Sequence, residues 1–202
     1  CCFLQATPEV VFVFFVSLWF LDSGRDAIVG AIRFCDGSVA GLSSVYLAHE
    51  VIFPVMTPAL SEWYPTAESL TKAPLIFDDS ISFLNPRADW ETWFRSQGID
   101  FAPTLGPRFS QADHAIDAAL AGVGVVLGRR ALVVKDLDDG RLVTPVPIAL
   151  DTGVRFRFLC ADGAQTRPQI AAFRDWIIAE IAKTAHITDA MTRLPSADFQ
   201  RP

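Results

Sequence analysis

The densest group of chemically capable side chains in this sequence lies between residues 110 and 117. It offers a hydroxyl, an imidazole and two carboxylates, from Ser110, His114, Asp113 and Asp117. A catalytic nucleophile needs a strained, exposed turn and a base that a third group orients. Side chains spaced along one helix rarely converge in that way. The segment is therefore not predicted to be a catalytic site.

Potential metal ligands are equally scattered. His49-Glu50 and His186 have no partners at ligand spacing, and Asp78-Asp79 is typical of a solvated turn at the end of a strand. Four cysteines lack both the paired spacing of a zinc site and the density of a disulfide scaffold: Cys1, Cys2, Cys35 and Cys160. The sequence predicts no metal and no cofactor, and its thiols fit the reducing cytoplasm.

The segment from Ser110 to Gly128 indicates where a ligand could bind instead. Ser110 is expected to be the N-cap of a helix with Asp113 in a capping box, Gly122 to end that helix, and the following valines to form a buried strand. A helix start presents free backbone N–H groups and the positive end of the helix dipole. A small acidic ligand would suit this position.

Composition narrows the class of protein. The 202 residues carry a formal net charge of -6 and are 51% hydrophobic, which disfavours a broad phosphate-binding surface and allows a sizeable core. The apolar run 10–21 is shorter than the roughly 20 residues that a membrane helix needs. We therefore predict a strand over 10–16, no membrane span and no direct contact with nucleic acid.

The remaining pattern alternates between strands and helices, as in an α/β fold. Strands are expected at 31–34, 50–56, 75–77, 108–109, 141–143 and 154–160. A short helix is expected between Pro65 and Pro74, another around Trp90 to Gln97, and an amphipathic closing helix whose first turn holds Pro168. A boundary between lobes is placed near residue 56, and the residues after Lys183 are expected to form a loosely attached tail.

These pieces, in this order, resemble the effector-binding domain of the LysR-type transcriptional regulators, in the branch of the glycine-cleavage activator and the β-lactamase-inducing regulators. The motifs that carry the resemblance are T-P-E-V at 7–10, A-I-R-F at 31–34, E-V-I-F-P-V-M-T-P at 50–58, P-L-I-F-D-D at 74–79, A-A-L-A-G-V-G-V at 118–125 and F-R-D-W-I at 173–177. Each motif is weak alone, but together they are collinear over residues 7–180.

The resemblance implies a type 2 periplasmic-binding-protein fold, with two α/β lobes and a ligand cleft at the hinge. Residues 1–56 with 159–184 would form lobe I, 57–158 lobe II, and 185–202 the tail. The family's first strand and most of its first helix are expected to be missing from lobe I. The winged helix-turn-helix that binds DNA is likewise expected to lie outside this chain.

The resemblance also implies a set of ligand-binding residues: Ser17, Asp22, Phe77, Ser110, Gln111, Ala112 and Phe156. Asp22 has the alternative of being a turn or N-cap residue. Ala112 stands where related regulators have a hydroxyl, and Phe156 where they often have tyrosine, so a hydrogen bond is lost while a stacking face remains. The cell-wall ligand of the β-lactamase regulators should therefore not be transferred to this chain.

The resulting hypothesis is a cytoplasmic sensor domain, without chemistry of its own, for a small carboxylate-bearing metabolite. The family resemblance implies a homodimer or tetramer, paired through the strand at 10–16, and contact with DNA only through the absent N-terminal domain. The alternative is a stand-alone solute-binding protein or an enzyme on the same fold.

Overall fold

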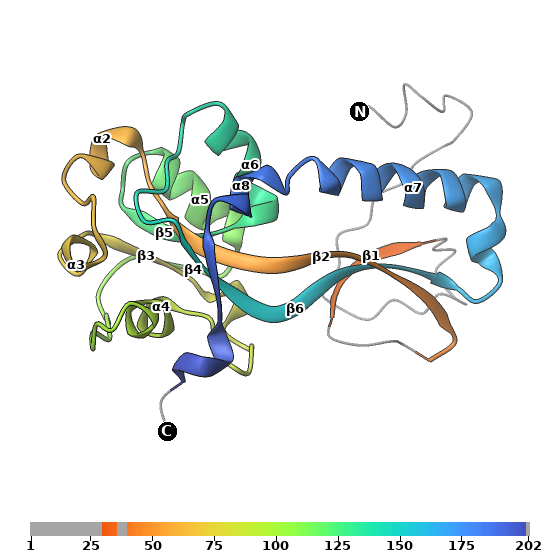
Figure 1. Cartoon of the computed structure of the whole chain (residues 1–202), viewed down its shortest axis with the longest axis horizontal. Coiled ribbons are helices and arrows are strands. Elements are labelled where there is room, and N and C mark those ends of the chain that lie inside the picture. The colour runs from red at the N-terminus through yellow and green to blue at the C-terminus, as the bar shows by residue number, and fades with distance from the viewer. Residues whose placement is uncertain (1–29, 36–39, 201–202) are drawn as a thin grey trace. The chain divides into compact units, whose positions relative to one another are not determined.

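The computed structural model describes residues 30–35 and 40–200 (Figure 1). Contacts between Cα atoms divide the chain into two compact units, 1–48 with 155–183 and 49–154 with 184–202. Two long strands, β2 (Leu42–Val55) and β6 (Ile148–Ala161), contribute residues to both units. These bounds differ from those of the predicted lobes, and the assignment of lobes stays a prediction. The predicted strand at 10–16, Ser17 and Asp22 lie outside the described residues.

The larger unit is built on a mixed sheet in the order β6-β2-β5-β3-β4. Strand β5 (Val125–Arg129) runs antiparallel to β2, whereas β3 (Leu75–Asp78) runs parallel to β5 and to the two-residue strand β4 (Arg108–Phe109). Helices α5 (Ala112–Leu120) and α6 (Arg130–Asp138) lie on one side of the sheet, and α4 (Trp90–Ser96) lies on the other (Figure 1). Because β3 and β4 are parallel, their C-terminal ends lie on the same side of the sheet.

Strand β2 is central to the sheet because its second half is apolar on both faces. Val51, Phe53 and Val55 are fully buried in a cluster with residues of α5 and α6. Ile52, which alternates with them and so leaves the opposite face, is equally buried. A strand covered on both faces reads as a continuous apolar run, which is what the sequence has here.

The predicted helix, glycine turn and buried strand are confirmed, with a different helix start. Gly122 has a φ of 78°, as the residue past a helix end requires, and residues 125–128 are buried. Gln111, however, occupies the N-cap in extended conformation without a side-chain cap. The Asp113 carboxylate accepts from the His114 amide at 3.0 Å instead. The predicted Ser110 cap and capping box are therefore wrong, because the helix begins one residue later than predicted.

Several short elements complete the larger unit. The helices α2 (Pro58–Ser61) and α3 (Ala67–Leu70) follow β2, and the 3-10 helix η1 (Asp79–Ile81) follows β3. Helix α6 was not expected from the sequence, and the strand expected at 141–143 is reduced to a single bridge between Met56 and Val143.

The smaller unit pairs β1 (Ala31–Cys35) antiparallel to the second half of β6. After η2 (Ala164–Thr166), helix α7 (Pro168–Ala182) begins at the predicted proline. Its apolar residues pack on the sheet in a cluster of Leu47, Phe158, Cys160, Ala164 and Ile170 with surrounding aromatic and aliphatic side chains. The predicted closing helix is thus confirmed.

The residues after Lys183 return to the larger unit. Helix α8 (His186–Asp189) is followed by β7 (Thr192–Pro195), which pairs parallel to the first half of β6, and by η3 (Ser196–Phe199), which packs against α4. The expectation of a loosely attached tail is wrong, since this segment adds a strand to the sheet. Among the described residues, no helix is long and apolar enough to cross a membrane.

Candidate functional site

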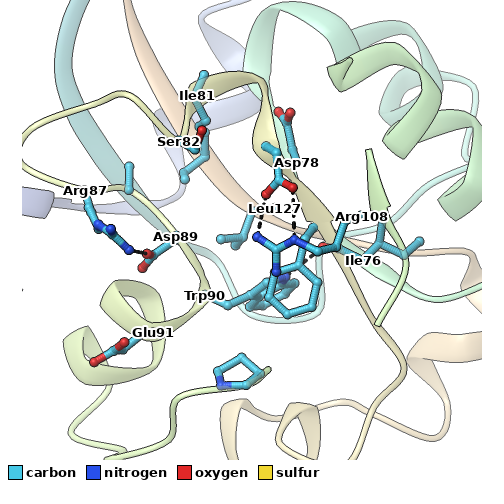
Figure 2. Close-up of a pocket in the computed structure, with 15 residues that line it drawn as sticks. Ile76, Asp78, Ile81, Ser82, Arg87, Asp89, Trp90, Glu91, Arg108 and Leu127 are labelled. Atoms are coloured by element: carbon cyan, nitrogen blue, oxygen red, sulfur yellow. Dashed lines mark hydrogen bonds and ion pairs between the residues drawn. The ribbon is translucent and has the colours of Figure 1, made fainter. Parts of the chain in front are cut away.

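A cavity of about 360 Å³ opens in the larger unit on the α4 side of the sheet, where β3 ends (Figure 2). Its apolar lining includes Ile52 of β2, Leu127 of β5 and Trp90 of α4. Its polar lining consists of Asp78, Asp79, Ser82, Arg87, Asp89, Glu91 and Arg108. A small ligand could therefore place an apolar part against the sheet and a polar part against the rim.

The floor of the cavity is fixed by a buried tryptophan. Trp90 is 2% exposed, and its indole Nε1–H donates to the carbonyl oxygen of Ile76 at 2.9 Å. Trp90 also stacks on Phe94, with the ring centroids 5.6 Å apart. The hydrogen bond ties the first turn of α4 to β3, so the distance between helix and sheet at this point is set by protein contacts.

One rim of the cavity is a closed charge pair. Arg108 donates from Nε and Nη2 to the two carboxylate oxygens of Asp79, at 2.9 and 2.6 Å. The same guanidinium lies 4.6 Å from the ring centroid of Phe77, the residue opposite it in the β3-β4 pairing. Two parallel hydrogen bonds and a cation–π contact hold the Arg108 side chain in one position.

Asp78 caps the 3-10 helix that follows β3. Its Oδ1 accepts from the Ser80 amide at 2.9 Å, while Oδ2 and the Ser80 hydroxyl are buried without a hydrogen-bond partner among the described residues. The carboxylate therefore serves the local backbone, and only part of its hydrogen-bonding capacity is used.

A buried ion pair lies beside the cavity floor. Glu50 is 1% exposed and accepts from Arg129 Nε at 2.8 Å. It precedes Ile52 by two residues on β2, so its side chain leaves the same face of the sheet. Burial raises the pKa of the Glu50 carboxyl, and the Arg129 guanidinium opposes that shift. This pair was not predicted from the sequence, although a glutamate at the start of the apolar run 51–56 was a signal for it.

The amino-acid sequence matches the family described as the LysR substrate binding domain over residues 5–182. The chain belongs to this family. It is 33% identical over 165 residues to the glycine cleavage system transcriptional activator of Escherichia coli, a match that covers 80% of this chain and 52% of the relative. The chain thus spans about half the length of that relative.

Solved structures of LysR effector-binding domains have the same fold. The AmpR effector-binding domain from Citrobacter freundii superposes with a TM-score of 0.70 at 20% identity, covering 90% of this chain and 88% of that one. The regulatory domain of CrgA, a LysR-type regulator from Neisseria meningitidis, gives 0.64 at 17% identity, with 89% and 88% covered. The predicted family and the predicted α/β fold of the type 2 periplasmic-binding-protein kind are confirmed.

Four predicted ligand-binding residues of this LysR domain lie at one edge of the sheet in the larger unit. Phe77 lines the cavity. Asp78 pairs with Phe109, so Ser110 follows directly where the paired strands end, and both Ser110 and Gln111 are exposed. Ala112 is buried at the start of α5. These last three residues do not line the cavity, and their role in binding stays a prediction.

Phe156 belongs to the smaller unit. Its ring lies 5.3 Å from that of Phe34, its partner across the β1-β6 pairing, and it packs against the core under α7. Its role in stacking on a ligand stays a prediction. In the part of the chain that the structure describes, no group of three His, Cys, Asp or Glu side chains could hold a metal ion.

Proposed function

We propose that this chain is the effector-sensing part of a bacterial LysR-type transcriptional regulator, and that it binds a small carboxylate-bearing metabolite without transforming it. The observation that carries the proposal is the family match over 5–182, together with relatives that are themselves transcriptional regulators. The cavity beside Phe77 supports it, since it offers a small ligand an apolar floor and a charged rim.

The proposed mechanism is a ligand-dependent change of closure between two lobes, 1–56 with 159–184 and 57–158. A ligand that contacts both lobes favours one closure over another, by no more than its difference in affinity for the two states. The proposed contacts are Ser17 and Asp22 from the first lobe and Phe77, Ser110, Gln111, Ala112 and Phe156 from the second, where Phe156 lies close to the boundary. Ser110 and Gln111, which are exposed just before α5, would lead the ligand carboxylate to the backbone N–H groups at the start of this helix.

The whole protein is proposed to work in the cytoplasm as a homodimer or tetramer. Contact with DNA would be made by an N-terminal helix-turn-helix domain. The sensor domain would then pass its change of closure to that domain, and no membrane or cofactor would take part.

A thermal-shift screen of amino acids and organic acids tests the proposal, because a ligand at free concentration L that binds only the folded state stabilises it by RT ln(1 + L/Kd). A true effector therefore gives a rise in melting temperature that keeps growing with the logarithm of its concentration above Kd. The matched variant is Ser110→Asp, which places a negative charge at a helix start and so leaves the fold at least as stable. The same charge repels a carboxylate, so the ligand affinity should fall by about tenfold and the rise in melting temperature should be smaller at the same ligand concentration. Undiminished binding of a carboxylate to Ser110→Asp would contradict the proposed site.

A further inference from the structure

The segment 184–200 packs on the larger unit but lies beyond the region that matches the family, which ends at residue 182. Its strand β7 pairs with β6, with Thr192 to Pro195 opposite Ile148 to Asp151. Within the segment, Arg193 Nη2 donates to the Thr188 hydroxyl at 2.8 Å, and η3 packs against α4. The segment is therefore a built part of the unit that contains the cavity.

Gln200 fastens this segment to the cavity wall at Arg87. The Arg87 amide donates to Gln200 Oε1 at 3.0 Å, and Gln200 Nε2 donates to the Arg87 carbonyl oxygen at 2.9 Å. The same Nε2 donates to the Ser196 carbonyl at 2.7 Å, which holds the Gln200 side chain in place. One side-chain amide thus satisfies both backbone groups of Arg87 and fixes where its side chain starts.

The two arginines that line the cavity are held very differently. Arg108 is engaged by both oxygens of Asp79, at 2.6 and 2.9 Å. Arg87 is 75% exposed at its side chain and contacts Asp89 at 3.9 Å, beyond hydrogen-bond distance (Figure 2). Breaking the Arg87 contact therefore costs little, whereas breaking the Arg108 pair loses two charge-assisted hydrogen bonds. Arg87 is the cation that a ligand can recruit.

The acidic residues of the wall restrict which anion can approach. Asp79 is neutralised by Arg108, and Asp89 caps α4 by accepting from the amide and the hydroxyl of Thr92, both at 2.9 Å. Asp78 and Glu91 also line the cavity and add negative charge. The lining as a whole holds four carboxylates and two guanidinium groups. Arg87 is therefore the place in this lining where a carboxylate can be held, and a second carboxylate would face like charge. The cavity thus admits no more than one carboxylate, beside a small apolar body.

We propose that Arg87 binds the carboxylate of a small monocarboxylate ligand in this cavity, and that Gln200 is its positioning residue, so that the C-terminal segment takes part in ligand recognition. This inference rests on the proposed sensing function and adds a ligand class to it. It places the carboxylate at Arg87, as an alternative to the start of α5, and the variants Arg87→Gln and Ser110→Asp distinguish the two positions. The carboxylate accepts hydrogen bonds from the guanidinium, and the apolar body lies against Ile52, Leu127 and Trp90.

Propionate and n-propylammonium are the probes, because they share size and shape and differ in the sign of their charge. Binding is followed in the whole chain by the NMR shift of the Trp90 indole N–H, which lies in the cavity floor. Propionate should bind in the millimolar range expected for so small a ligand, and n-propylammonium should bind about tenfold more weakly. Succinate, with two carboxylates, should also bind more weakly than propionate.

The variants separate recognition from folding. Arg87→Gln should weaken propionate about tenfold, while Arg95→Gln, which removes the same charge from α4 outside the cavity, should not. Gln200→Ala should speed hydrogen exchange of the Arg87 amide about tenfold and weaken propionate severalfold. Gln169→Ala, an exposed glutamine of α7, is the control for Gln200→Ala.

Three results would overturn the inference: no propionate binding to the unmodified chain, equal binding of the two isosteric probes, or unchanged propionate affinity in Arg87→Gln. Unchanged affinity in Gln200→Ala despite fast exchange at Arg87 would remove the positioning role. The outcome is separable from that of the sensing function. If a metabolite binds Arg87→Gln as well as the unmodified chain, the sensing function stands and this site is refuted. If propionate binding depends on Arg87 but no metabolite binds, this site stands and the sensing function loses its support.

Discussion

The two faces of the sheet in the larger unit have opposite character, although the same strands form both. On the α5 and α6 face, Val51, Phe53 and Val55 meet aliphatic side chains and leave a closed core. On the α4 face, the alternate residues of β2 include Glu50 and Ile52, and the space beyond them holds an ion pair and a cavity. One face is therefore a closed core, whereas the other combines the buried aromatic side chains of α4 with a cavity.

The largest expected effect comes from the closed face. Phe53→Ala removes a fully buried ring from that core and leaves a hole that its neighbours cannot fill, so we expect a loss of about 4 kcal/mol in the free energy of unfolding. Urea denaturation measures it. Phe83→Ala, at a phenylalanine that is 71% exposed, is the matched control and should change little. A loss below about 1 kcal/mol in Phe53→Ala would mean that this face is not the closed core described here.

The ion pair of the α4 face is expected to come next. Glu50→Leu leaves the Arg129 charge without its carboxylate in a largely buried position and should cost about 3 kcal/mol. Replacing both residues, as Glu50→Leu with Arg129→Met, should recover most of that loss, because no unpaired charge remains. Chemical denaturation of the two single variants and the double variant measures the coupling. If the losses simply add, the two side chains do not stabilise each other.

The smallest effect concerns pH. Burial raises the pKa of Glu50 above its usual 4.5, so the folded protein holds this proton more tightly than the unfolded chain does. The contribution of Glu50 to stability is therefore greatest at low pH and falls as the pH rises through the folded-state pKa. We expect the stability of the unmodified protein relative to Glu50→Gln to decline as the pH rises above the usual glutamate pKa of 4.5. A difference that is flat or rises with pH would contradict the direction of the shift.

The sequence predicted those elements whose signals are local. The helix, glycine and apolar strand at 112–129 follow one another in the chain, and Pro168 marks the start of α7. The start of α5 was misplaced by one residue because an N-cap is decided by backbone geometry, and Gln111 adopts the extended conformation there without a side-chain bond. Strand β7 was missed because four residues have little preference of their own and depend on pairing with β6.

The cavity could not be predicted from the sequence, for a related reason. Its walls come from β2, β3, α4, β4 and β5, which are spread over residues 42–129. Of the predicted ligand contacts, Phe77 lines it. Gln200 and Arg87 illustrate the limit, since 113 positions separate them and neither belongs to a recognisable motif. The family resemblance identified the strand ends where a site could lie, but not the partner that each side chain would meet.

Gly124 is a position where the fold should tolerate no residue with a side chain. A β-carbon there would lie 2.1 Å from the carbonyl oxygen of Pro74, so any other residue would force apart the backbones just before β3 and β5. Gly122, two positions earlier, has open space around it and needs only a left-handed backbone, which asparagine adopts readily. In a library with every codon at both positions, selected for a folded product, survivors should carry glycine alone at 124 and glycine or asparagine at 122.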